Sequence, residues 1–294
     1  MQSLKFFIIA CLIAPFGLLP LRWSQAIGSQ LGLLLIKCNR KRAHISHCNL
    51  KVCFPEKSAA EREKLLLQNA METGKWFLES AYVWFGNPDY LSKRVTVKNP
   101  QLLEIAHRQN RGVVIVLPHL GNWELLNFYI PKYYPFAAMY KPVKAAWFEK
   151  VIFKSRSRLG SKMFATNSSG VRQALKGMRN NLVLAILPDH LPTKEAGVYA
   201  PFFGQPALTG KLTQSLINSN QSEVLIASVV RKPKGQGFEI VFHRVEGMHT
   251  EDKVAAATAL NSAIEKSILL APEQYQWVYR RFANPPSGTA CIYH

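Results

Sequence analysis

Acidic side chains are scarce in this chain of 294 residues. Asp and Glu total 18 whereas Lys and Arg total 37, so the formal net charge is +19 at pH 7. A surplus of this size points to an anionic partner such as nucleic acid, membrane headgroups or an acidic protein. The charge alone does not choose among these partners. Intrinsic disorder is excluded, because 48% of the residues are hydrophobic and only 19% are charged.

Cysteine is also sparse. The five cysteines are odd in number and irregularly spaced, which argues against a disulfide framework and favours a reducing compartment. A histidine and cysteine group, made of His44, His47, Cys48 and Cys53, lacks the spacing of a zinc finger or knuckle. We therefore expect a basic structural segment there and no metal site.

Apolar runs near the N-terminus are shorter than the roughly twenty residues that a straight transmembrane helix needs. Residues 6–21 carry no charge but include Pro15 and Pro20, and a second apolar stretch follows at 27–36. The pair predicts an interfacial or re-entrant anchor, or one tilted span with a flanking helix. A signal peptide with a small-x-small site at 24–26 is the alternative, although Arg22 weakens it.

The charges beside these stretches predict on which side of the membrane the chain lies. A basic cluster follows the apolar residues, made of Lys37, Arg40, Lys41, Arg42 and Lys51. No acidic residue precedes Glu56. By the positive-inside rule this cluster should be cytoplasmic, where it would adhere to an anionic membrane surface. We predict an N-terminal hydrophobic membrane-anchor helix within residues 1–37 and one catalytic domain over residues 38–294.

The rest of the chain has the pattern of an α/β fold. A capping box at Ser58 and Glu61 should open a long helix. Short β-branched runs then alternate with helical stretches. Strands are expected at 113–117, 136–140, 182–187, 224–230 and 238–242, and helices at 123–129, 145–158, 169–179, 209–218 and 251–270. The alternation predicts a mixed, largely parallel central sheet flanked by helices, with a hairpin loop at 232–237.

Common nucleophile and nucleotide motifs are missing. The chain has no G-x-S-x-G elbow, which excludes a serine hydrolase of that type. The glycines at 204–211 have the wrong spacing for a P-loop, and Gly235 and Gly237 lack the third glycine of a dinucleotide fingerprint. We therefore expect neither a covalent nucleophile nor a cofactor.

The most informative segment runs from a predicted buried strand through Pro118 to His119 and Glu124. His119 should lie at the carboxyl edge of the sheet, where α/β proteins bind ligands. Within one helix, five residues would separate the two side chains by about 140°, but with His119 on the turn they can meet. A carboxylate on one ring nitrogen would leave the other nitrogen free to take a proton from a hydroxyl. The spacing fits equally a helix-start glutamate beside an unrelated histidine.

His119-Leu-Gly-Asn-Trp-Glu124 is a His-x4-acid motif, and it resembles that of the bacterial lipid A biosynthesis lauroyl/myristoyl acyltransferases, relatives of the glycerolipid acyltransferases. Further segments resemble that family in the same order: Asn49–Glu56, Met139–Pro142, Arg156–Gly160, Leu187–His190, Pro201–Gly204 with Thr209, and Ala271–Phe282. The likeness covers roughly residues 42–282, and the ordered set is more specific than any single motif.

The resemblance implies transfer of a fatty acyl chain from acyl carrier protein to a hydroxyl of a phosphorylated, acylated glucosamine lipid at the cytoplasmic face of the inner membrane. In this scheme His119 removes the acceptor proton, Glu124 orients the imidazole, and the alkoxide attacks the thioester directly, without a metal or cofactor. The tetrahedral oxyanion needs donors. We expect these from Arg158 and from backbone amides near Asn122, because a helix start offers unpaired N–H groups.

Other polar residues are expected near the substrate. Asp189 follows the strand at 182–187 and should share the catalytic edge, as a substrate-orienting or arginine-positioning residue or simply as a surface turn. Lys141 stands where relatives often have arginine, so a phosphate or sugar acid would meet a point charge instead of a fork; a solvated lysine is the alternative. Arg156 and Arg158 belong to a stretch, residues 141–179, with ten Lys or Arg and one acid. The acidic carrier protein or the lipid phosphates could dock there.

Three alternatives stay open at this point. A membrane-tethered nucleic-acid-binding protein would explain the charge, but no helix-turn-helix, zinc-finger or RNP pattern is present, and no nucleic-acid partner is expected. An acyltransferase acting on a lysophospholipid or aminolipid would use the same base. A catalytically inactive lipid-binding relative is disfavoured by the intact His119 and Glu124 pair.

Overall fold

The computed structural model describes residues 11, 14–142, 149, 153, 155–157 and 160–293. Its helices are α2 (Leu21–Cys38), α3 (Arg40–Cys53), α4 (Ala59–Trp84), α5 (Pro88–Ser92), α6 (Pro100–Arg108), α7 (Leu126–Tyr129), α9 (Ser168–Arg179), α10 (Leu212–Asn220) and α11 (Lys253–Ile268). Short 3-10 segments are η1 (Ala14–Leu18), η2 (Trp123–Leu125), η3 (Ile130–Lys132), η4 (Lys194–Ala196), η5 (Pro233–Gly235) and η6 (Pro272–Gln274). The strands are β1 (Val95–Lys98), β2 (Val113–Val116), β3 (Phe136–Tyr140), β4 (Lys162–Ala165), β5 (Val183–Ile186), β6 (Gly197–Phe202), β7 (Gln205–Gly210), β8 (Glu223–Arg231) and β9 (Phe238–Arg244).

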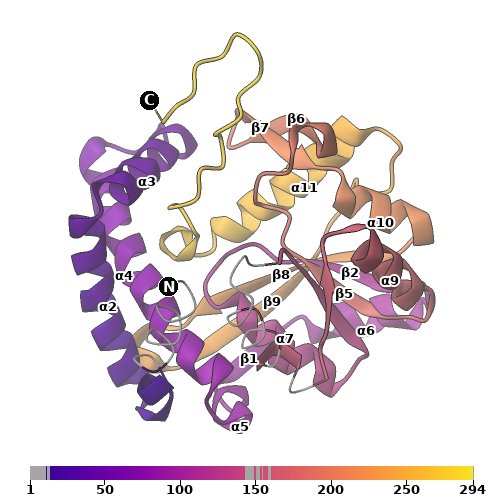
Figure 1. Ribbon diagram of the computed structural model, residues 1–294, viewed down its shortest axis with the longest axis horizontal. Coiled ribbons are helices and arrows are strands. Elements are labelled where there is room, and N and C mark those ends of the chain that lie inside the picture. The colour runs from indigo at the N-terminus through magenta and orange to yellow at the C-terminus, as the bar shows by residue number, and fades with distance from the viewer. Residues whose placement is uncertain are drawn as a thin grey trace.

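Seven of the described strands form one sheet in the order β1-β9-β8-β2-β5-β3-β4 (Figure 1). Every neighbouring pair is parallel except β8 and β9. Those two strands form the predicted hairpin, which Lys232 closes by donating its N–H to the Gly237 carbonyl. Strands β6 and β7 form a separate antiparallel pair. The predicted mixed, largely parallel sheet flanked by helices is therefore confirmed.

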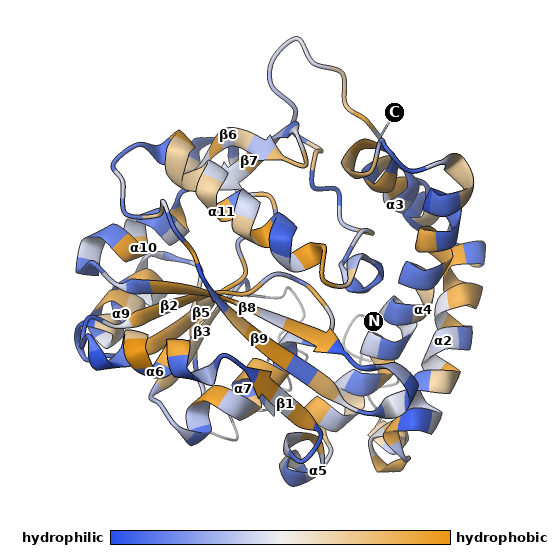
Figure 2. Cartoon of the chain, turned by 180° about the vertical axis from the view of Figure 1, so that it is seen from behind, coloured by the Kyte–Doolittle hydropathy of each residue, from blue (hydrophilic) through white to orange (hydrophobic). Residues whose placement is uncertain are grey.

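The central strands of the sheet are buried on both faces. Alternate residues of β2 belong to different cores: Val114 and Val116 pack with side chains of α9, α10 and α11, whereas Val113 and Ile115 pack with side chains of α6 and α7. Because neither face of such a strand meets water, its residues do not alternate between apolar and polar, and its sequence is uniformly apolar. Figure 2 shows this as the largely orange colour of β2, β3 and β5.

Helices α2, α3 and α4 stand together beside the sheet (Figure 1). The predicted capping box opens α4, because the Ser58 hydroxyl accepts from the Glu61 amide and the Glu61 carboxylate accepts from the Ser58 amide. Helices α2 and α4 touch backbone to backbone. A Cβ added to Gly32 would lie 1.9 Å from the carbonyl oxygen of Ala70, so only glycine allows this approach.

The predicted membrane-anchor helix is not supported by the structure. Residues 1–10, 12 and 13 lie outside the described residues, and 14–18 form the short η1. Within the described part of the chain, every helix is too short or too polar to cross a membrane. The predicted boundary between residues 37 and 38 falls at the last turn of α2, whose buried side packs against α4.

Candidate active site

His119 and Asp189 meet at the carboxyl edge of the sheet. Strands β2 and β5 are parallel neighbours that pair Val116 with Ile186, and each of the two polar residues lies three positions beyond its strand. The backbone N–H of His119 donates to Asp189 Oδ2 at 2.8 Å, and its ring Nδ1 lies 2.7 Å from Asp189 Oδ1. Both carboxylate oxygens therefore hold the same residue, which fixes the position and the plane of the imidazole.

The environment of Asp189 sets the protonation of the pair. Burial raises the pKa of the Asp189 carboxyl, but attraction to His119 and the hydrogen bonds from it outweigh burial and hold that pKa well below its usual range. An ionised Asp189 requires the proton on Nδ1 of His119. The other nitrogen, Nε2, has no hydrogen-bond partner among the described residues, and 14% of the His119 side chain is exposed to solvent. Nε2 is therefore free to accept a proton.

The His119 ring lies on a stack of two further rings. The His190 ring is parallel to it at 3.9 Å between centroids, and Tyr279 covers the other face of His190 at 3.8 Å. His190 Nε2 donates to the side-chain oxygen of Gln276 at 3.0 Å. Burial, followed by repulsion from His119, lowers the pKa of His190 to about 4. His190 is thus neutral near pH 7, so it adds no positive charge beside the His119 ring.

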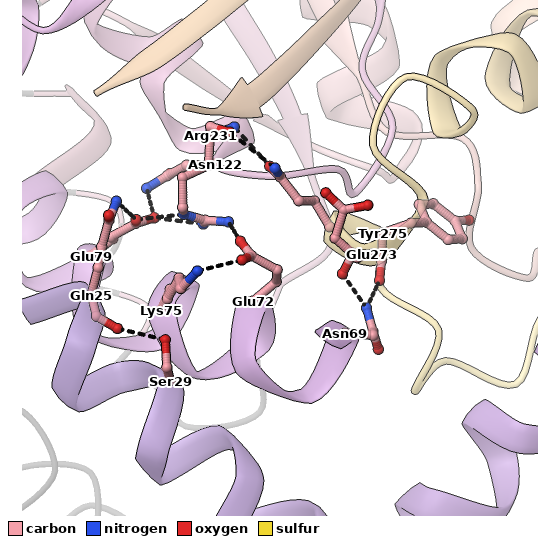
Figure 3. Close-up of polar contacts among 11 residues, drawn as sticks. Gln25, Ser29, Asn69, Glu72, Lys75, Glu79, Asn122, Arg231, Glu273 and Tyr275 are labelled. Atoms are coloured by element: carbon pink, nitrogen blue, oxygen red, sulfur yellow. Dashed lines mark hydrogen bonds and ion pairs between the residues drawn. The ribbon is translucent and has the colours of Figure 1, made fainter. Parts of the chain in front are cut away.

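Residues 273–279 clamp the turn that carries His119. The Gln276 amide donates to the His119 carbonyl at 3.1 Å, and the Gly121 amide donates to the Gln274 carbonyl at 3.0 Å. Asn69 of α4 in turn donates to the carbonyls of residues 273 and 275, and Asn49 of α3 to those of 277 and 279. Figure 3 shows the Asn69 contacts. Helices distant in sequence therefore hold the His119 turn in place.

A buried charge cluster lies behind the same turn (Figure 3). Arg231, at the end of β8, binds both carboxylate oxygens of Glu79 at 2.6 Å and also binds Glu72. Glu79 accepts further bonds from Gln25 of α2 and from the Asn122 side chain. Burial lowers the pKa of Arg231, but the two glutamates raise it above its ordinary value overall. The cluster joins α2, α4 and β8 to the His119 turn.

Glu124 does not bond His119 in the described structure. Its carboxylate instead accepts from Arg156 Nε at 2.8 Å and from Nη2 of the same guanidinium. The cause is local geometry. Residues 123–125 form η2, in which successive side chains are about 120° apart. The Trp123 and His119 rings meet edge to face with their centroids 4.9 Å apart, so the next side chain, Glu124, points elsewhere. Asp189, which was expected to touch substrate or an arginine, is the carboxylate on the histidine.

The other predicted site residues are scattered. The amides of Gly121 and Asn122 donate to the carbonyls of Gln274 and Val229, so neither is free to act as the predicted oxyanion donor in this conformation. The Asn122 side chain is buried on Glu79. Arg156 is committed to Glu124. Lys141 is exposed just after β3, and Arg158 lies outside the described residues.

The histidine and cysteine group of the N-terminal region is spread along α3. His44 and Cys48 are one turn apart and touch at 3.5 Å, whereas Cys53 is buried. Within the described residues, no group of three or more His, Cys, Asp or Glu side chains is arranged to hold a metal ion.

A carboxylate-bound histidine at the carboxyl edge of a parallel sheet lies where α/β proteins bind their ligands. The profile of the bacterial lipid A biosynthesis acyltransferases matches residues 2–284. The chain therefore belongs to this family and is an acyltransferase, as the ordered motifs indicated.

Individual relatives agree with the family assignment. The chain is 30% identical over 269 residues to the lipid A biosynthesis palmitoleoyltransferase of Escherichia coli K12. The matched region covers 91% of this chain and 87% of the relative. It is 27% identical over 269 residues, with the same coverage, to the lauroyltransferase of that organism, and 24% identical over 283 residues to its myristoyltransferase, covering 94% and 86%.

Proposed function

We propose that this chain transfers a fatty acyl group from the thioester of acyl carrier protein to a hydroxyl of a lipid A precursor, with His119 as the general base. The main support is the pair of hydrogen bonds that His119 donates to Asp189, which leaves Nε2 of His119 without a partner among the described residues at the edge of the sheet. The similar proteins support the acceptor class, because their names place palmitoleoyl, lauroyl and myristoyl transfer in lipid A biosynthesis.

The chemistry needs no covalent enzyme intermediate. Nε2 of His119 takes the proton of the acceptor hydroxyl while the hydroxyl oxygen forms a bond to the thioester carbonyl carbon. The carbon–sulfur bond of the tetrahedral intermediate then breaks, and the sulfur leaves with the proton that His119 had taken. The ionised Asp189 stabilises the imidazolium between these steps. General base catalysis of this kind contributes roughly 10²–10⁴-fold to the rate.

In this scheme the two acids have different tasks. Asp189 orients His119. Glu124, which the family resemblance assigns to the histidine, acts through Arg156, because its carboxylate holds that guanidinium by two bonds. Arg156 is thereby held in a fixed position.

In this proposal the side of α2 that faces away from α4 contacts the membrane. At 100° per residue, Trp23, Ile27 and Leu34 fall on one stripe of the helix. All three are exposed, Trp23 by 60% and Leu34 by 57%, and the basic residues of the N-terminal region lie close in sequence. A helix with one apolar side on protein and another apolar side open suits the interface of an anionic membrane. In the proposal the enzyme therefore works at the cytoplasmic face of the inner membrane, the side that the positive-inside rule predicts for the basic cluster.

The test is an acyl-transfer assay with purified full-length protein in detergent. Lauroyl, myristoyl and palmitoleoyl thioesters of acyl carrier protein serve as donors, with a lipid A precursor or a lysophospholipid as acceptor, and the products are identified by mass spectrometry. We expect transfer to the lipid A precursor, its loss in His119→Ala, and its retention in His243→Ala, a matched exposed histidine on β9. Turnover by His119→Ala, or transfer to the lysophospholipid alone, would refute the proposal.

A further inference from the structure

A cationic cavity of about 400 Å³ lies between the start of α3 and the chain after residue 277. Lys41 and Arg42 line it from the helix, and Arg280 lines it from the C-terminal segment. No acidic side chain belongs to its lining. The basic cluster that the sequence places after the apolar N-terminal stretches therefore contributes two of its members to a defined cavity.

The charges of this cavity are available for a ligand. Within the described part of the chain, none of its three cations forms an ion pair. Nε of Arg280 is buried and has no hydrogen-bond partner among the described residues, which is unfavourable for a charged donor. Asn39, also in the lining, caps α3 by accepting from the Arg42 amide, so the positive end of the helix dipole adds to the same field.

The cavity adjoins the catalytic rings. Tyr279 lines it and also stacks on His190, which stacks on His119. Leu191, a further lining residue, donates its amide to the Tyr279 hydroxyl at 2.9 Å. A group held in the cavity is therefore only two stacked rings away from the proposed base, a separation that one acceptor molecule can span.

We propose that this cavity binds a phosphate group of the lipid acceptor and so places the acceptor hydroxyl before His119. Arginine offers a planar fork that matches phosphate oxygens, and the lysine adds a point charge. The inference rests on the proposed function for the identity of the acceptor. The binding of phosphate by the cavity can be tested without turnover.

The first experiment measures binding alone. Glucosamine 1-phosphate is titrated into the full-length protein and followed by phosphorus NMR. Arg280→Gln, or Lys41→Gln with Arg42→Gln if the first variant folds poorly, should weaken binding by about tenfold or more. The Arg280 guanidinium lies over the Tyr293 ring at 4.9 Å. Arg94→Gln is the matched control, because Arg94 lies over the Tyr90 ring at 3.8 Å but is outside the cavity. Equal affinity in the wild type and both cavity variants would overturn the proposal, even if acyl transfer is observed.

The second experiment distinguishes the sources of the phosphate. With a phosphorylated acceptor, Arg280→Gln should raise the acceptor KM about tenfold and leave kcat, the donor KM and binding to phosphatidylglycerol vesicles unchanged. With the dephosphorylated acceptor, wild type and variant should have the same high KM. A rise confined to the donor KM, or a loss confined to vesicle binding, would overturn the assignment to the acceptor. Absence of any transfer by the wild type would instead refute the proposed function and leave the binding result standing.

Discussion

Asp189 accepts two hydrogen bonds from His119, one from the backbone N–H at 2.8 Å and one from ring Nδ1 at 2.7 Å. A single ring contact would leave the imidazole free to rotate about that bond. The backbone contact removes this freedom by fixing the carboxylate to the turn that carries the ring. In the proposed mechanism the imidazole is therefore pre-organised before any substrate arrives.

His190 makes the folded protein sensitive to mild acid. Its pKa is lowered to about 4 in the folded state, against about 6.5 in an unfolded chain. Between these values the unfolded state binds more protons, so stability is full above about pH 6.5 and declines as the pH falls toward 4, by roughly 2–3 kcal/mol. Urea unfolding between pH 4 and 7.5 should show this slope, and His190→Phe, which keeps a ring but cannot titrate, should lose most of it. An equal slope in both proteins would contradict the assignment.

Gly32 should tolerate no side chain. A methyl group would lie 1.9 Å from the Ala70 carbonyl oxygen, and both partners are helical backbone that cannot move alone. We expect Gly32→Ala to cost about 3 kcal/mol and to lower Tm by about 5–10 °C. Gln30→Ala, at an exposed position of the same helix, should leave Tm within 2 °C or so, as surface changes usually do. Thermal unfolding that does not separate the two variants would contradict this close helix contact.

Removing the positive charge from the buried charge cluster should destabilise the fold. Arg231→Met leaves Glu79, which is fully buried, with an uncompensated charge and should cost about 3–5 kcal/mol. Glu79→Met combined with Arg231→Met removes both charges and should recover part of the loss. Chemical unfolding of the single and double variants measures the difference. A double variant no more stable than Arg231→Met would show that the uncompensated charge of Glu79 does not cause the loss of stability.

Much of the sheet is readable from the sequence because its central strands are buried on both faces. The continuous apolar runs at 113–117 and 182–187 mark β2 and β5 within one residue at each end. The short strands β1 and β4 escaped prediction because their exposed and partly buried positions give no continuous apolar run. The hairpin of β6 and β7 was also missed.

The site was predictable only in part. His119 stands out because it follows a buried strand, and Asp189 was placed at the same edge for the same reason. Their pairing requires the knowledge that β2 and β5 are neighbours, which spacing along the chain does not contain. Glu124 was the nearer acid in sequence, but the 3-10 geometry of η2 directs it to Arg156. The stack of His190 and Tyr279 joins residues 89 positions apart and left no local signal.

Steady-state kinetics of Asp189→Asn beside Glu124→Gln test directly whether Asp189 orients His119. The asparagine can still accept from the His119 backbone, but its amide nitrogen faces ring Nδ1 and forces the proton onto Nε2, the atom that must act as base. We predict that kcat of Asp189→Asn falls by about 10²–10⁴-fold with an acceptor KM within about twofold of the wild type, and that Glu124→Gln is less impaired in kcat. A kcat for Asp189→Asn within threefold or so of the wild type would contradict the central claim that Asp189 orients His119 for proton transfer.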